Sequence, residues 1–165
     1  MKKLIFVRHG RAEEQSDNFP DFERSLTAKG KIVSAEMAAI LSEKEKGRCV
    51  FVTSPAFRAY ETALVFARVL DVDPDSLILS NALYTTADLK TIANIVEKID
   101  DKIDTLFFFG HNPSFTEIPD RLSRDGCDFL PKSGIVCLSF KTDSWTGIVH
   151  LKGRIDYFLK PEKSS

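Results

Sequence analysis

Short runs of consecutive apolar residues alternate along the chain with longer segments in which apolar residues recur every three or four positions. Continuous apolar runs bounded by polar residues are typical of strands that are buried on both faces of a sheet. We therefore predict buried strands at residues 2–8, 49–54, 76–80 and 105–110.

The segments between these runs have the periodicity of helices. One helix is predicted after Thr27, a residue type that caps helix N-termini, a second after Pro55 and a third after Thr86. The apolar positions that set the period are Val33, Met37, Ile40 and Leu41 in the first helix, Tyr60, Leu64, Ala67 and Leu70 in the second, and Leu89, Ile92, Val96 and Ile99 in the third.

This order of strands and helices predicts an α/β fold with a mostly parallel central sheet and helices on both faces. The later runs "GIVCLSF" (134–140) and "GIVHLKG" (147–153) are separated by a short polar segment and predict a hairpin on one edge. A chain of 165 residues suits one domain, which we place at residues 1–160. The polar tail, residues 161–165, is predicted to be disordered.

Charge and composition narrow the classes of partner. The 23 basic and 24 acidic side chains leave a net charge of −1, without the basic excess that nucleic acids or membrane surfaces attract. No segment approaches the roughly 20 apolar residues of a membrane span. The apolar run near the N-terminus is too short for a signal peptide, and Arg8 interrupts it.

The three cysteines are odd in number and widely spaced, without a C-x-x-C pair. Cys49 and Cys137 lie in apolar runs and are predicted to be small core residues, whereas Cys127 is predicted to lie in a loop. This pattern is typical of a reduced, cytoplasmic protein, which is the location we expect.

Basic and imidazole side chains follow three of the predicted strands. Arg8 and His9 end the first strand, Arg58 lies on the first turn of the helix after the second, and His111 follows the fourth. Since the carboxyl ends of parallel strands meet at one edge of a sheet, we expect these four side chains to lie close together.

The chemistry of this set points to phosphate. Arginine offers a planar fork of donors that matches phosphoryl oxygens, and helix N-termini add backbone N–H groups. Gly10 lets backbone approach a ligand closely. A neutral imidazole is nucleophilic near pH 7 and can accept a phosphoryl group, while the second histidine and the arginines stabilise charge on the other oxygens.

Metal binding competes with this interpretation, and the third histidine of the chain lies outside the set. Two histidines can also be metal ligands, but flanking arginines repel a cation and no carboxylate adjoins the strand ends, so we expect neither metal nor cofactor. His150 lies on the predicted edge strand without a basic partner and is interpreted as structural. The chain has no Walker, dinucleotide-binding, cysteine-phosphatase or G-x-S-x-G motif, which leaves histidine as the candidate nucleophile.

Arg8-His9-Gly10, "SPAFRAYET" (54–62) and "GHNPS" (110–114) together resemble the signatures of the histidine phosphatase, or phosphoglycerate-mutase-like, superfamily. "DFERSLTAKG" (21–30) and "KSGIVCLSF" (132–140) are similar to its small SixA-type branch of phosphohistidine phosphatases. The resemblance implies that His9 is the phosphorylated nucleophile and that Arg8, Arg58 and His111 form the phosphate pocket. It also implies that Arg24 lies near that pocket, while Asp21 either anchors its loop or touches substrate.

The chain departs from the family at one position. Many members have a carboxylate after the third strand that protonates the leaving group, but here the stretch reads "NALYTT" (81–86). The nearest carboxylate is Asp88, which we interpret as a charge on the first turn of the following helix. Without that acid, alkyl phosphates are poor substrates, whereas phosphohistidine, whose imidazole leaves readily, remains suitable.

We therefore expect a metal-independent phosphatase that acts through a phosphohistidine intermediate, with protein phosphohistidine as substrate. A broad phosphatase for small phosphorylated metabolites is an alternative on the same scaffold. An inactive phosphoprotein-binding module is a third hypothesis, although such modules commonly lose the nucleophile and His9 is present. Neither a nucleic acid nor a membrane is an expected partner.

Overall fold

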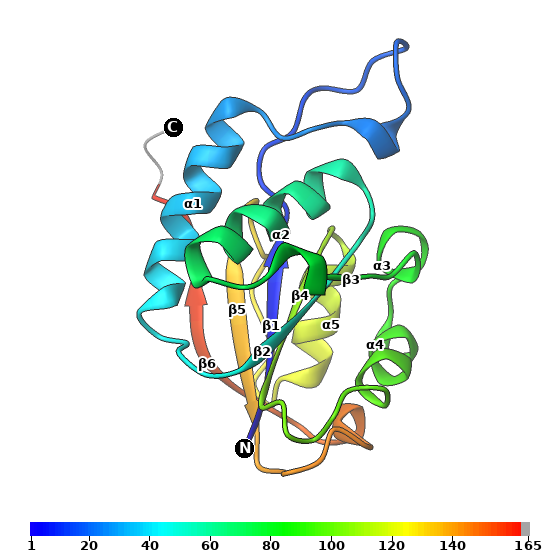
Figure 1. The fold of residues 1–165 in the computed structure, drawn as a ribbon. Coiled ribbons are helices and arrows are strands. Elements are labelled where there is room, and N and C mark those ends of the chain that lie inside the picture. Colours follow the sequence, from blue (N-terminus) through cyan, green and yellow to red (C-terminus); the bar gives the residue numbers. More distant parts are fainter. Residues whose placement is uncertain (163–165) are drawn as a thin grey trace.

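The apolar runs form the middle of a six-stranded sheet, ordered β3-β2-β4-β1-β5-β6, in the computed structural model, which describes residues 1–162 (Figure 1). β4 pairs in parallel with β1 and with β2, and β2 pairs in parallel with β3. β5 is antiparallel to β1 and to β6. The strands are β1 (Lys2–Arg8), β2 (Cys49–Thr53), β3 (Ile78–Leu79), β4 (Thr105–Gly110), β5 (Ile135–Phe140) and β6 (Arg154–Leu159). The predicted mostly parallel α/β sheet is confirmed.

Helices cover both faces of this sheet, as the sequence predicted (Figure 1). They are α1 (Ala28–Ser42), α2 (Phe57–Leu70), α3 (Ala82–Thr85), α4 (Leu89–Val96) and α5 (Ser114–Leu122). The predicted cap at Thr27 is present, since its side chain accepts a hydrogen bond from the Gly30 N–H. Within residues 1–162, no helix combines the length and apolar character needed to cross a membrane.

Alternation along the central strands divides the core into two layers. Phe6 and Phe108 point to the face covered by α3, α4 and α5, where Ile92 of α4 is also buried. Ile5 and Phe107 point to the opposite face, which α1 and α2 cover. Both faces of β1 and β4 are therefore dry, which explains why their sequences are continuous apolar runs.

Two predicted strands differ from the structure. Only Ile78 and Leu79 of the segment 76–80 form a strand, and both are exposed because β3 is the edge strand beside β2. The late hairpin exists, but its second strand is β6 rather than residues 147–153. Gly147 has a φ of 76° and starts a 3-10 helix, Ile148–His150, so that His150 lies on this turn and not on an edge strand.

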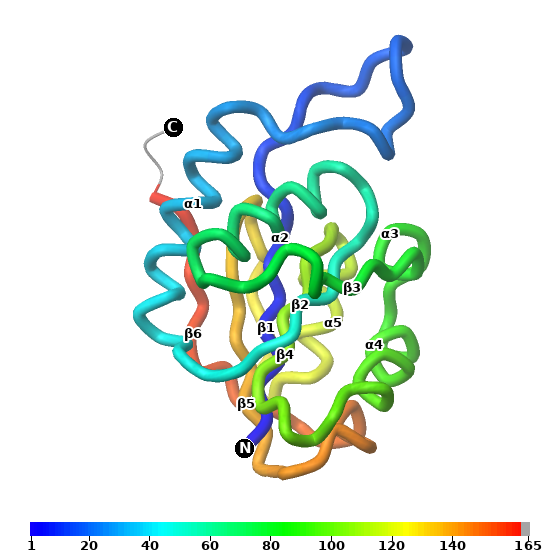
Figure 2. Tube along the Cα trace, viewed as in Figure 1, coloured from blue at the N-terminus to red at the C-terminus, as the bar shows by residue number. Residues whose placement is uncertain are grey.

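The ends of the chain bear on two further predictions. Figure 2 shows that the end of β6 lies beside α1, and residues of β6 pack against the core that α1 covers. Cys137 is buried in that core and Cys49 packs against it, as predicted. Of the tail predicted to be disordered, residues 163–165 lie outside the described part of the chain, and the assignment of tail and domain boundary stays a prediction.

The helical period of α1 also includes a residue that is not in the core. Met37 is 3% exposed, whereas Ile40, which the period placed with it, is 48% exposed. We predict that Met37→Ala lowers the free energy of unfolding by about 2–5 kcal/mol, because a cavity replaces a buried side chain. Ile40→Ala should cost about 1 kcal/mol or less. Urea denaturation of both variants measures this, and equal losses would contradict the assignment of the two faces.

Candidate active site

Three neighbouring strands end at the same edge of the sheet. In the register of the sheet, Arg8 of β1 pairs with Gly110 of β4, whose neighbour Phe109 pairs with Thr53 of β2. The His9 N–H donates to the Gly110 carbonyl at 3.0 Å, which continues the pairing one residue beyond the strand. The residues that follow these strand ends are consequently brought together.

A cavity of about 250 Å³ lies at this edge. The five residues that the sequence singled out all line this cavity. Arg8 and His9 come from the end of β1, Arg58 from α2, His111 from the position after β4, and Arg24 from the loop before α1. The lining residues are Arg8, His9, Ala12, Arg24, Arg58, His111, Asn112 and Lys132. The cavity therefore combines two imidazoles with four cationic side chains.

The ring of His9 is held in one orientation. Its Nδ1 lies 2.7 Å from the Gly10 carbonyl oxygen, which can only accept, so Nδ1 carries the proton and Nε2 the lone pair. Burial lowers the pKa of His9 to about 3, opposed by the Gly10 hydrogen bond and assisted by the charges of neighbouring arginines. At neutral pH His9 is thus an uncharged imidazole with a nucleophilic Nε2.

Gly10 is required next to this imidazole. A Cβ atom at this position would lie 2.7 Å from the Ser34 hydroxyl and 3.1 Å from the Ser133 hydroxyl. The Gly10 N–H donates to the Thr62 hydroxyl of α2 at 3.0 Å. The chain after β1 is therefore clamped between α1, α2 and the segment before β5, which fixes the carbonyl that orients His9.

The second histidine faces the first. The ring centroids of His9 and His111 are 5.1 Å apart, and His111 Nε2 lies 2.8 Å from the Ser54 hydroxyl. That hydroxyl accepts from the Ala56 N–H and keeps its own hydrogen to donate; when it donates that hydrogen to His111 Nε2, the proton of the ring lies on Nδ1. Burial, followed by the charge of Arg58, lowers the pKa of His111 to about 4.

One carboxylate joins two of the three arginines that line the cavity. Asp21 accepts from Arg58 Nη2 at 3.0 Å, from Arg24 Nε at 2.9 Å and from the Tyr84 hydroxyl at 2.8 Å. Burial alone would raise the pKa of Asp21, but the Tyr84 hydroxyl and the two guanidiniums outweigh it and lower the pKa to about 2. Of the two roles left open for Asp21, the observed contacts are those of an anchor.

Three buried side-chain nitrogens have no hydrogen-bond partner within residues 1–162, and all three belong to residues of this cavity. They are Arg8 Nε, Arg58 Nε and His111 Nδ1. Unpaired buried donors are costly, and proteins tolerate them where a ligand supplies the acceptor. An anion with several oxygens, such as a phosphoryl group, matches this set.

Sequence reasoning missed several parts of the site. Asn112 directly follows His111, so the motif that revealed the histidine could also have indicated the amide. Lys132 comes from the segment before β5, which has no periodicity to place it. The contacts of Ser54 with His111 and of Tyr84 with Asp21 depend on tertiary structure, and no local pattern announces them.

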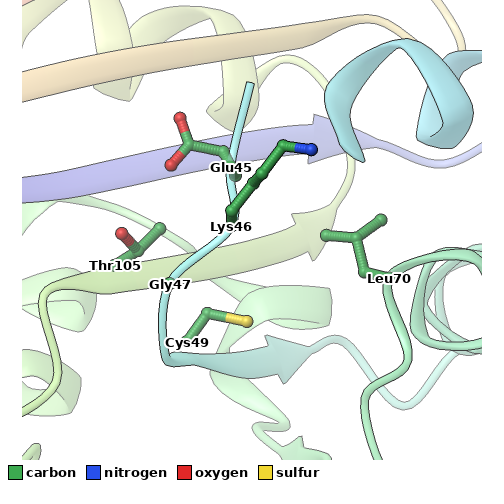
Figure 3. A pocket seen from close by; sticks show the side chains of 6 residues that line it. All are labelled: Glu45, Lys46, Gly47, Cys49, Leu70 and Thr105. Carbon is green, nitrogen blue, oxygen red and sulfur yellow. The ribbon is translucent and has the colours of Figure 1, made fainter. Parts of the chain in front are cut away.

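A smaller hollow of about 90 Å³ lies at the opposite end of the sheet, where Cys49 begins β2 and Thr105 begins β4 (Figure 3). The Glu45 carboxylate there accepts hydrogen bonds from Lys3 and from the Tyr157 hydroxyl, so it is satisfied by the fold. Within residues 1–162, no group of three or more His, Cys, Asp or Glu side chains is arranged to hold a metal ion.

Comparison with known proteins adds a family and a set of folds. A family model described as the histidine phosphatase superfamily (branch 1) matches residues 4–101, which is more than half of the chain. This match includes the segments that carry His9, Arg24 and Arg58. No curated protein matches the chain.

Several solved structures share the fold at low sequence identity. A structure of the protein histidine phosphatase SixA with tungstate has a TM-score of 0.80 at 19% identity, covering 96% of this chain and 97% of that one. A proposed phosphohistidine phosphatase SixA from Agrobacterium tumefaciens has a TM-score of 0.77 at 18% sequence identity. The match covers 97% of this chain and 98% of that one. The ecdysone phosphate phosphatase from Bombix mori, solved with tungstate, has a TM-score of 0.70 at 13% sequence identity. The match covers 100% of this chain and 96% of that one.

Both site histidines should resist protonation in the folded protein. Their pKa values of about 3 and about 4 lie below the roughly 6.5 of an unfolded histidine. As pH falls below about 6.5, the two histidines bind protons in the unfolded chain but stay neutral in the folded protein. The free energy of unfolding therefore decreases with acidification. NMR titration, with His9→Asn and His111→Asn for assignment, should find both rings neutral at pH 6. The urea-unfolded protein is the control, and midpoints near 6.5 in the folded protein would contradict the burial argument.

Proposed function

The chain belongs to the histidine phosphatase superfamily (branch 1), and on this premise we propose that it hydrolyses protein phosphohistidine through a phosphoryl group carried on His9. The family inferred from the motifs is thereby confirmed, and a phosphorylated substrate follows from it. The identity of that substrate, the intermediate and the roles of the site residues are the proposal.

The observation that carries the proposal is the set of unpaired donors around an oriented imidazole. His9 keeps Nε2 unprotonated because Nδ1 is bonded to the Gly10 carbonyl. The unpartnered nitrogens of Arg8, Arg58 and His111 belong to side chains lining the same cavity. A nucleophile surrounded by donors that lack acceptors is what in-line transfer of an anionic phosphoryl group requires.

The reaction takes two displacements at phosphorus. In the first, the lone pair of His9 Nε2 forms a bond to phosphorus while the bond from phosphorus to the substrate imidazole breaks. That imidazole leaves as a neutral ring because its other nitrogen carries a proton. In the second, water attacks the phosphoryl group on His9, the new P–N bond breaks, and orthophosphate is released with His9 regenerated.

The arginines and His111 act on the three non-bridging oxygens of the phosphoryl group. Arg8 and Arg58 neutralise the negative charge of the phosphoryl group, and His111 Nδ1–H donates to one of its oxygens. Arg24 is more exposed than Arg58, with 21% against 7% of its side chain exposed, and it is held by hydrogen bonds from Nη1 to the Glu13 carbonyl at 2.8 Å and from Nε to Asp21. Its role is to complete the cationic rim of the cavity. Two related folds, SixA and ecdysone phosphate phosphatase, were solved with tungstate, an oxyanion of similar shape, which supports an anion site here.

The surroundings of the cavity favour a good leaving group. Asp21, with a pKa of about 2 and both carboxylate oxygens bonded, holds no proton to donate at neutral pH. Asp88 is bound as the N-cap of α4, where it accepts from the Thr91 N–H at 2.9 Å. An alkoxide therefore finds no donor in either carboxylate, which favours phosphohistidine over small alkyl phosphates.

A cytoplasmic location of the protein stays a prediction.

The covalent step makes the first prediction of this proposal. Brief incubation with ³²P-labelled phosphohistidine peptide, quenched in alkali, should leave an acid-labile label on the wild-type protein. His9→Ala should carry none, because its nucleophile is absent. His150→Ala, which removes an exposed histidine outside the cavity, is the matched control and should be labelled like wild type. Label retained in His9→Ala would exclude His9 as the acceptor. A wild type that binds orthovanadate yet neither turns over nor becomes labelled would favour the inactive binding module.

The anchoring role of Asp21 gives the second prediction. Across aryl phosphates of rising phenol pKa, kcat/KM of the wild type should fall steeply, since general-acid help of about 10²–10⁴-fold is missing. Asp21→Asn should lower kcat/KM about tenfold to a hundredfold for every substrate, because Arg58 loses its ionic partner and shifts. Selective slowing of substrates with poor leaving groups would instead make Asp21 an acid. A flat wild-type series would favour the broad metabolite phosphatase.

A further inference from the structure

A groove of about 800 Å³ adjoins the cavity. It runs between the outer face of α1, residues 129–133 and residues 160–162, and we name it the α1 groove. Figure 1 shows the end of β6 beside α1. Residues 160–162, which follow β6, therefore line the α1 groove opposite the helix. Arg8 and Lys132 line both the cavity and the α1 groove, so the two are continuous.

The outer face of α1 is apolar without contributing to the core. Met37, Ala38 and Leu41 bury the inner face of the helix against the sheet. On the outer face, Ile32 is 62% exposed and Ile40 is 48% exposed, and both line the α1 groove. A helix that is apolar on two faces is typical of one with neighbours on both sides, and within residues 1–162 neither Ile32 nor Ile40 packs against either core cluster.

Phe129 extends the same apolar surface toward the cavity. Its ring is 66% exposed and lies 5.5 Å from the guanidinium carbon of Arg8. Arg8 also donates to the Leu130 carbonyl at 3.2 Å, which ties residues 129–133 to the site. A protein that presents a phosphoryl group to His9 would therefore cover Phe129 and, beyond it, the α1 groove.

The charge of the α1 groove selects the kind of protein. Among residues 1–162, five cationic side chains line it, against two carboxylates, although the whole chain has a net charge of −1. The cations are Arg8, Arg11, Lys29, Lys132 and Lys160, and the carboxylates are Glu36 and Glu162. Two copies of this chain facing each other through the groove would bring like charges together, which disfavours self-association.

We propose that the α1 groove is the docking surface for the phosphohistidine-bearing protein, and that it recognises an apolar surface studded with acidic residues beside the phosphohistidine. The proposal rests on the proposed function and deepens it, since it adds a recognition element outside the phosphate cavity. Ile32, Ile40 and Phe129 bury the apolar part of the partner, and Lys29, Arg11 and Lys160 pair with its carboxylates.

Two synthetic phosphohistidine peptides of equal length test this. Both carry an amphipathic flank with the same apolar residues, with glutamates in one peptide and lysines in the other, and imidazole phosphate is the small probe. Wild type should have kcat/KM about tenfold or more higher for the acidic peptide. Ile32→Glu and Lys29→Glu should abolish this preference while leaving turnover of imidazole phosphate unchanged. Ile78→Glu, at an equally apolar exposed position on β3 outside the groove, should behave like wild type.

Each other outcome overturns the proposal. Equal rates for the two peptides in wild type would show that the α1 groove does not read the flank. A loss of peptide preference in Ile78→Glu equal to that in Ile32→Glu would assign the effect to surface charge in general. A concentration-dependent dimer in sedimentation velocity that Ile32→Glu dissolves would make a second copy the occupant. Failure to hydrolyse any phosphohistidine probe, imidazole phosphate included, would instead remove the proposed function and this proposal with it.

Discussion

The position of β4 between β1 and β2 determines where the two histidines of the candidate site lie. Its pairing with Arg8 on one side and with Thr53 on the other brings three strand ends to one edge. His9 and His111 then face each other because each is the first residue after its strand. A slip of one residue in the pairing of β1 with β4 would turn the residues of one strand to the opposite face and separate the two imidazoles.

A second constraint is the cost of gathering cations beside buried imidazoles. The arginines lower the pKa of both histidines, in addition to burial, which keeps His9 neutral and nucleophilic. Asp21 offsets part of the repulsion by bonding Arg24 and Arg58, while leaving three donors of the cavity unpaired. Under the proposed function, these unpaired donors await an anion and lower the stability of the protein until one binds, as strained or unsatisfied groups at functional sites commonly do.

The fold and the members of the site were predictable where the signal is local. Continuous apolar runs identified the central strands, and Arg8, His9, Arg58 and His111 each lie within a few residues of a strand end, so parallel pairing gathers them. Arg24 lies in the loop before α1, and only the resemblance to the family indicated it. Signals that depend on tertiary structure were not readable. Helical spacing cannot distinguish the two apolar faces of α1, so Ile40 belongs to the same period as the buried Met37 although it is exposed. The run 147–153 has the composition of a strand, but a left-handed Gly147 turns it into a 3-10 helix. Asp21 gains its role only by meeting Arg58 and Tyr84 from other elements.

The central claim is that the phosphoryl group passes through His9 before it reaches water. The stereochemical course at phosphorus tests it most directly, because each in-line displacement inverts the configuration. A thiophosphoryl substrate made chiral with oxygen isotopes, hydrolysed in isotopically labelled water, yields thiophosphate whose configuration can be determined. Two displacements predict overall retention of configuration. Inversion would mean that water attacks the substrate directly, and His9 would then not be the nucleophile.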